Sequence, residues 1–109
     1  MSNSFATIVT ELQTVIKDRQ DADESSSYVA KLSKRGRKKI AQKVGEEAVE
    51  VAIAAAENDP KEVVQESADL LFHLLVLWEK MGIDADDIGA ELASRAGISG
   101  IEEKKSRKS

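Results

Sequence analysis

The sequence contains no cysteine and a single histidine in its 109 residues. The absence of cysteine excludes disulfides, thiol chemistry and cysteine-ligated zinc. With His73 as the lone histidine, a metal site built from several histidines of one chain is also excluded. No segment resembles the strained turn that presents a serine nucleophile. The residue count alone does not exclude a Ser-His-Asp triad, but if the chain carries out catalysis, carboxylates and a metal ion are the favoured tools.

Other features of the sequence limit its partners and location. The net charge of −4 argues against general binding to nucleic acid. No apolar run is long enough to span a membrane, and the first residues do not have the pattern of a signal peptide. We therefore expect a cytoplasmic protein that binds neither nucleic acid nor membrane. The length suits one domain with one modest core.

Apolar residues recur at three- and four-residue steps along the chain, which predicts an all-α protein, a helical bundle of four to five helices. Serine, glycine, proline and aspartate residues mark where the helices start and stop. The expected helices cover about 4–20, 28–35, 37–57, 60–81 and 85–95. We assign residues 1–97 to the domain and residues 98–109 to a flexible charged tail.

The segment from Leu70 to Trp78 is apolar almost all round, and only His73 interrupts it. A helix that is buried on every side needs more neighbours than a chain of this length easily supplies. We therefore predict that a second copy completes the bundle, as a homodimer across a two-fold axis. The alternative is a monomer with an exposed apolar face.

Four carboxylates form two helical pairs, Glu47 with Glu50 and Glu66 with Asp69. Each pair is spaced i, i+3, so each presents two oxygen ligands on one helix face. Glu47 falls inside the apolar stripe of its helix and Glu66 lies at the edge of its own, where a charge is costly unless it is paired or bound to metal. Two facing helices of this kind can enclose a hard divalent cation such as Mg²⁺.

A cluster of basic residues precedes the acids and straddles Gly36. It contains Lys31, Lys34, Arg35, Arg37, Lys38, Lys39 and Lys43. Beside a metal site, such a cluster suits a polyphosphate, because lysine and arginine hold the phosphate oxygens that the cation does not bridge. Two plainer interpretations remain open. The cluster can be a solvated basic face, and Lys39 and Lys43 can form ordinary salt bridges with the acids.

Three stretches of the sequence resemble the phosphoribosyl-ATP pyrophosphohydrolase family. They are SYVAKL at 27–32, KVGEEAVE at 43–50 and ESADLLFHL at 66–74. This family belongs to the MazG-like all-α nucleotide pyrophosphohydrolases, whose shared pattern is Glu-Glu-x-x-Glu followed by Glu-x-x-Asp. The pattern matches here at Glu46, Glu47, Glu50, Glu66 and Asp69. The resemblance covers roughly residues 5–95, and the flanking blocks with His73 point to the phosphoribosyl-ATP branch. Phe72 stands where the family often has tyrosine.

The resemblance implies hydrolysis of phosphoribosyl-ATP to phosphoribosyl-AMP and pyrophosphate, the second step of histidine biosynthesis. It implies a catalytic site in which Mg²⁺ is bound by Glu47, Glu50, Glu66 and Asp69, and our choice of general base is Glu47. Glu46 points away from the stripe and is expected to pair with a neighbouring basic residue.

Four further residues are expected to bind the substrate. Lys39 and Lys43 would hold phosphate oxygens, Tyr28 would stack on a base, and His73 would contact the substrate or orient a ligand. For Tyr28 and His73 the alternatives are an aromatic anchor of a short helix and a packed structural histidine. Gly45 lies inside a helix at a cost of about 1 kcal/mol relative to alanine, which either close helix approach or chance would explain.

Two other functions remain compatible with the sequence. One is a housecleaning pyrophosphohydrolase of the same superfamily, which would act on free nucleoside triphosphates. The four acids do not separate it from the phosphoribosyl-ATP enzyme, and only the flanking motifs favour the latter. The other is a non-catalytic helical dimerisation module, for which Glu47→Gln would be harmless and Mg²⁺ would not stabilise the fold.

Overall fold

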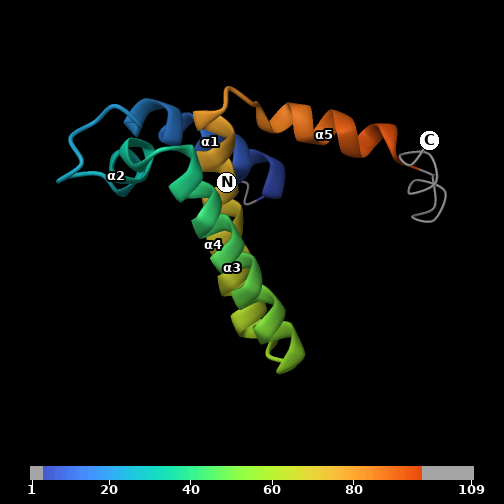
Figure 1. Ribbon diagram of the computed structural model, residues 1–109. Helices are drawn as coiled ribbons and strands as arrows, with labels where there is room; N and C mark the ends of the chain where they lie inside the picture. Colours follow the sequence, from blue (N-terminus) through green and yellow to red (C-terminus); the bar gives the residue numbers. More distant parts are fainter. Residues whose placement is uncertain (1–3, 97–109) are drawn as a thin grey trace.

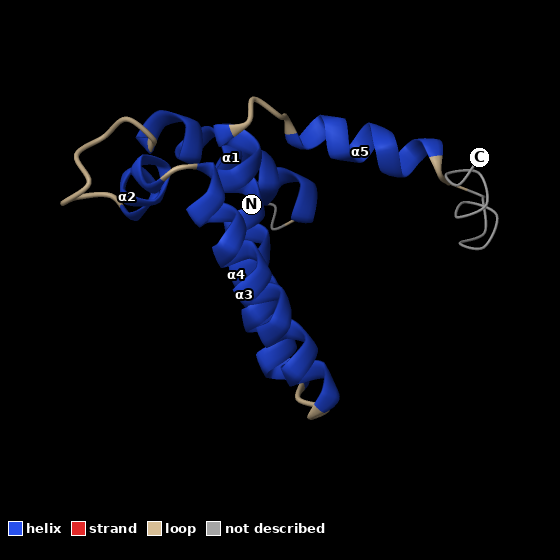
Figure 2. Ribbon diagram, viewed as in Figure 1, coloured by secondary structure: helices blue, strands red, loops and turns tan. Residues whose placement is uncertain are grey.

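The computed structural model describes residues 4–96 and consists of five helices, which confirms the all-α prediction. The helices are α1 (Phe5–Arg19), α2 (Tyr28–Arg35), α3 (Arg37–Ala56), α4 (Pro60–Lys80) and α5 (Ala85–Ser94). Figure 2 shows a long loop between α1 and α2, at residues 20–27, and shorter connections between the other helices; residues 4–96 contain no strand. The tail predicted at 98–109 lies outside the described residues. Each predicted helix boundary agrees with the structure to within one residue.

Side chains cap the helices where the sequence predicts helix starts. The hydroxyl of Ser27 accepts a hydrogen bond from the backbone N–H of Ala30 at the start of α2. The carboxylate of Asp59 accepts one from the N–H of Glu62, with proline at the first position of α4. Asp84 forms a reciprocal capping box at the start of α5. These caps satisfy N–H groups that have no partner inside the helix.

Helices α3 and α4 form an antiparallel hairpin that projects from the rest of the molecule (Figure 1). Helices α1 and α2 pack at the base of this hairpin, and α5 extends away from it. The core cluster lies at the base, where the first four helices meet, and comprises Ile16, Val29, Leu32, Ile40, Leu75 and Val76. The middle of the hairpin, which carries the four acids, therefore lies outside this core.

Several large apolar side chains remain exposed in the single chain. Phe5 on α1 is 72% exposed and Val64 on α4 is 69% exposed. In the segment 70–78, His73, Leu75 and Val76 are buried, while the other apolar side chains are only partly buried. The predicted homodimer is not tested by a single chain and stays a prediction.

No helix among residues 4–96 combines the length and the apolar character that crossing a bilayer requires. The cytoplasmic location expected from the sequence stays a prediction.

Candidate functional site

Three of the four predicted metal ligands come together in the middle of the hairpin. Glu47 from α3 and Glu66 and Asp69 from α4 offer carboxylate oxygens that all lie within 4.8 Å of one another. Glu47 and Glu66 are half-buried and Asp69 is exposed, as their positions on the helix faces predict. We call these three residues the acidic cluster. Glu50 is exposed and lies outside this group.

The charges of the site are concentrated around Glu66. Partial burial raises the pKa of Glu66 above the ordinary value of a glutamate, and neighbouring carboxylates raise it further. These neighbours are Asp69, Glu47, Glu50 and Glu62, in decreasing order of effect. Glu50 is therefore close enough for its charge to act on the cluster. Glu62, in the first turn of α4, is a further acidic neighbour outside the predicted ligand set.

Among the described residues, the carboxylates of this site lack ion-pair partners. Within residues 4–96, none of the four predicted ligands forms an ion pair with a lysine or arginine. The ordinary salt-bridge interpretation therefore does not describe these acids. A set of close carboxylates, all offering oxygen, suits a hard divalent cation such as Mg²⁺. The residues present thus fit the predicted metal.

Lys43 pairs with the glutamate that the sequence placed away from the site. Its ammonium lies 3.6 Å from a carboxylate oxygen of Glu46, and the side-chain amide of Gln42 donates to the same carboxylate across 2.9 Å. The hydrogen bond from Gln42, with the charge of Lys43, lowers the pKa of Glu46. The prediction that Glu46 pairs with a basic neighbour is confirmed. Lys39 donates to the side chain of Gln42 across 3.5 Å.

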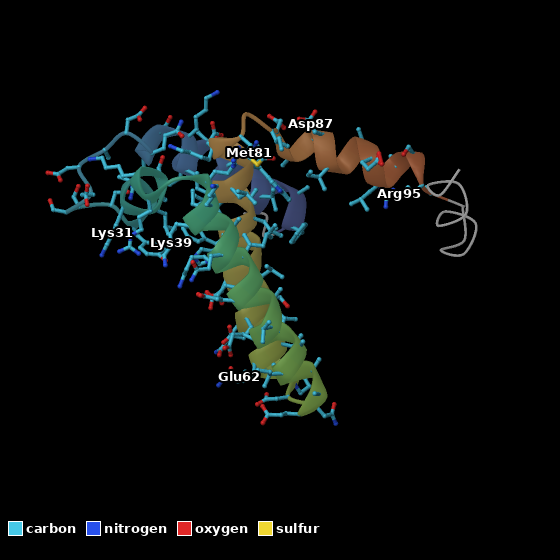
Figure 3. The ribbon with its side chains drawn as sticks, in the orientation of Figure 1. Lys31, Lys39, Glu62, Met81, Asp87 and Arg95 are labelled. Carbon is cyan, nitrogen blue, oxygen red and sulfur yellow. The ribbon has the colours of Figure 1, made fainter. Side chains whose placement is uncertain are left out.

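The basic residues gather where α2 meets α3. Gly36 joins the two helices with φ of 90° and ψ of 169°, a conformation that is essentially restricted to glycine. Figure 3 shows Lys31 of α2 and Lys39 of α3 extending on the same side of the molecule. We call the basic residues between 31 and 43 the basic segment. Because α3 and α4 are antiparallel, Lys43, one turn before Glu47, lies level with the turn that follows Asp69.

His73 is nearly enclosed, and both of its ring nitrogens have partners. It is 6% exposed; its Nδ1 lies 2.8 Å from the carbonyl oxygen of Asp69, and its Nε2 lies 3.3 Å from the hydroxyl of Tyr28. Tyr28 stacks on Phe72 with ring centroids 6.0 Å apart, and the residue as a whole stays 51% exposed. His73 therefore has the surroundings of a structural histidine, whereas one side of Tyr28 remains accessible.

Sequence reasoning did not predict the contact between Tyr28 and His73. The two residues lie 45 positions apart, and no local spacing relates them. It also offered close helix approach as a reason for Gly45, which the structure contradicts. A Cβ at that position would meet no atom within 4 Å.

Comparisons with known proteins agree on one family. The sequence model described as "Phosphoribosyl-ATP pyrophosphohydrolase" matches residues 9–96. The chain is 55% identical over 101 residues to a "Phosphoribosyl-ATP pyrophosphatase" of Rhodospirillum rubrum, covering 93% of this chain and 86% of the relative. A protein of the same name from Paramagnetospirillum magneticum is 57% identical over 100 residues, covering 92% of each chain. Another from Azospirillum brasilense is 49% identical over 104 residues, covering 95% of this chain and 94% of the relative.

Proposed function

Because this chain belongs to the phosphoribosyl-ATP pyrophosphohydrolase family, we propose that it hydrolyses phosphoribosyl-ATP to phosphoribosyl-AMP and pyrophosphate, in the second step of histidine biosynthesis. The matched region contains the whole hairpin and with it every predicted ligand. The structural observation that carries the proposal is the acidic cluster, whose carboxylates form no ion pair with a lysine or arginine of residues 4–96.

In this proposal Glu47, Glu66 and Asp69 hold Mg²⁺, and Glu50 joins them from the same face of α3. Bound there, the cation would neutralise phosphate charge and lower the pKa of a coordinated water. Glu47 is the proposed general base, since it is half-buried within the cluster and carries a second oxygen that can accept a proton.

The reaction that this site supports is a displacement at phosphorus. The oxygen of water forms a bond to the α-phosphorus, its proton passes to Glu47, and the bond to the bridging oxygen breaks so that pyrophosphate leaves. Lys39 and Lys43 would hold phosphate oxygens, because they lie on α3 two turns and one turn before Glu47, respectively. For Lys43 this requires exchange of its contact with Glu46, a partly exposed pair of small energy. The accessible side of Tyr28 would stack on a base.

We also propose that the protein acts as a homodimer. An apolar hollow of about 470 Å³ lies between α1 and the first half of α4. Its lining includes Phe5, Ile8 and Val64, which are all exposed in the single chain. A second copy would bury these side chains and supply the neighbours that the hairpin lacks. Light scattering should give twice the mass of the chain, and Ile8→Asp should shift it towards the monomer.

The function is tested by pyrophosphate release from purified protein with Mg²⁺. Phosphoribosyl-ATP is offered beside ATP and other free nucleoside triphosphates, and Glu47→Gln serves as the inactive reference. Release from phosphoribosyl-ATP with little from free triphosphates supports the proposal. Preference for a free triphosphate would assign the chain to the housecleaning enzymes. If no substrate were turned over, the interpretation as a non-catalytic dimerisation module would be favoured.

A further inference from the structure

We propose that Tyr28 and His73 are positioning residues, whose hydrogen bond holds the start of α2 against α4 and thereby fixes the basic residues of α2, Lys31, Lys34 and Arg35, relative to the acidic cluster. The inference rests on the proposed function, because it assigns these two segments to opposite ends of one phosphate-bearing substrate. It gives His73 a role that needs no contact with that substrate.

The direction of the hydrogen bonds follows from the atoms involved. The carbonyl oxygen of Asp69 can only accept, so Nδ1 of His73 donates to it across 2.8 Å. In the neutral ring Nε2 is then the acceptor, and the hydroxyl of Tyr28 donates to it across 3.3 Å. The histidine is almost wholly enclosed, so water does not substitute readily for either partner. Both bonds therefore specify one tautomer of His73.

The two bonds connect the parts of the site that have to cooperate. The carbonyl at one end belongs to Asp69, a member of the acidic cluster. The hydroxyl at the other end belongs to the first residue of α2. Helix α2 carries Lys31 and continues through Gly36 into the lysines of α3. A second contact between α2 and α4, from Lys80 to the hydroxyl of Ser33 at 3.5 Å, lies at the other end of this short helix.

Aromatic packing makes the hydroxyl of Tyr28 separable from its ring. The ring stacks on Phe72 at an interplanar angle of 20°, and Phe72 meets His73 edge-on at a centroid distance of 5.2 Å. These contacts are apolar and survive in Tyr28→Phe, so the ring keeps its place while the hydrogen bond is lost. The substitution therefore tests the bond alone.

Loss of the bond should affect substrate binding and leave the metal site unchanged. In Tyr28→Phe we expect KM for phosphoribosyl-ATP to rise about three- to tenfold, the effect of one net hydrogen bond, and kcat to stay within about twofold. Mg²⁺ affinity, measured by calorimetry without substrate, should not change, because the acidic cluster lies within the α3–α4 hairpin. The control for general loosening of the core is Val76→Ala, which removes buried methyl groups from α4 and should leave KM unchanged.

A double-mutant cycle separates positioning from general loosening. His73→Phe keeps an aromatic ring and removes the acceptor, so Tyr28→Phe should add little to it. Additive effects on KM would overturn the proposal. The proposal would also be overturned if kcat and Mg²⁺ affinity fell in Tyr28→Phe while KM rose. A rise of KM in Val76→Ala as large as that in Tyr28→Phe would overturn it too.

A spectroscopic measurement keeps the test independent of turnover and of how well His73→Phe folds. His73 is the lone histidine of the chain, so its ring nitrogens give unambiguous ¹⁵N signals once any purification tag is removed. We expect the tautomer with the proton on Nδ1, and a displaced Nε2 signal in Tyr28→Phe. The opposite tautomer, or an unchanged Nε2 signal, would overturn the inference. Inactivity of the wild-type protein towards phosphoribosyl-ATP would instead count against the proposed function, whatever the tautomer.

Discussion

Glu47 and Glu66 lie on the two helices of the hairpin, α3 and α4, and present carboxylate oxygens within 4.8 Å of each other. Two like charges at this distance repel, and the repulsion contributes to the raised pKa of Glu66. Nothing in the packing of α3 on α4 requires acids there, since the core lies elsewhere. We expect this arrangement to lower stability when no cation is bound and to become favourable when a cation binds.

Glu47→Gln should abolish most activity while leaving the fold intact. We expect kcat to fall about 10²- to 10⁴-fold, the usual effect of losing a general base, because the amide can neither accept the proton nor bind Mg²⁺ well. The thermal midpoint without metal should stay equal or rise slightly, since one of the repelling charges is gone. The matched control is Glu57→Gln, an exposed glutamate of the same hairpin, which should leave kcat unchanged.

Mg²⁺ should stabilise the wild-type protein in proportion to the logarithm of its concentration. At a hundred times the dissociation constant the stabilisation is about 2.7 kcal/mol. For a domain of this size this corresponds to a rise in Tm on the order of 10 °C. Differential scanning fluorimetry with KCl at matched ionic strength separates binding from screening. If Mg²⁺ raised the Tm of Glu47→Gln by the same amount, the acidic cluster would not be the binding site.

The stability of the metal-free protein should depend on pH through Glu66. Its pKa is raised in the folded state, so folding favours the protonated form. This contribution is fully present below the ordinary pKa of a glutamate and is lost as pH rises through the raised value. Thermal midpoints between about pH 4 and pH 8 should therefore show a smaller decline in Glu66→Gln than in the wild type.

With Mg²⁺ the dependence on pH should reverse over the same range, because the cation binds the deprotonated carboxylates. The quantity compared is the difference in thermal midpoint between Glu66→Gln and the wild type at each pH. The titration of distant acids is the same in both proteins and cancels in this difference. Identical pH profiles of the two proteins without metal would contradict the assignment of the shift to Glu66.

Two glycine substitutions should change stability in opposite directions. Gly45→Ala should stabilise by about 1 kcal/mol, because the residue is helical and a Cβ there meets no neighbour. Gly36→Ala should destabilise by about 1–3 kcal/mol, because its φ of 90° with ψ of 169° is strained for any other residue. Urea unfolding measures both. A loss of stability in Gly45→Ala would mean that another protein molecule, such as a second copy of this chain, packs against this position.

Local signals in the sequence were sufficient for the helices and for most of the acidic site. Asp59 followed by Pro60 predicted the start of α4 because a cap and a proline act within one turn. The spacing of Glu47 and Glu66 on their apolar stripes predicted which carboxylates would be half-buried. A short turn then brings the two stripes face to face, so helical periodicity together with this turn predicts the approach of Glu47 to Glu66.

Contacts between distant segments were beyond this reasoning. The hydrogen bond from Tyr28 to His73 depends on how α2 crosses α4, and no spacing records that geometry. Periodicity also could not show that α1 and α2 cover only the base of the hairpin, because it reports which face is apolar and not which element covers it. Glu50 shows a related limit. It forms an i, i+3 pair with Glu47, yet it lies outside the closest group of carboxylate oxygens.

The far end of the hairpin, where Glu57 to Pro60 turn the chain around, is exposed throughout and lies well away from the core. Asn58 completes the turn with a φ of 56°. Exposed loop tips of this kind accept inserted sequence, and each doubling of loop length costs only about 0.6 kcal/mol. The tip is therefore a natural attachment point for a fluorophore or a short reporter peptide. Such a label would report binding at the acidic cluster from a few helical turns away, without covering the acidic cluster or the basic segment.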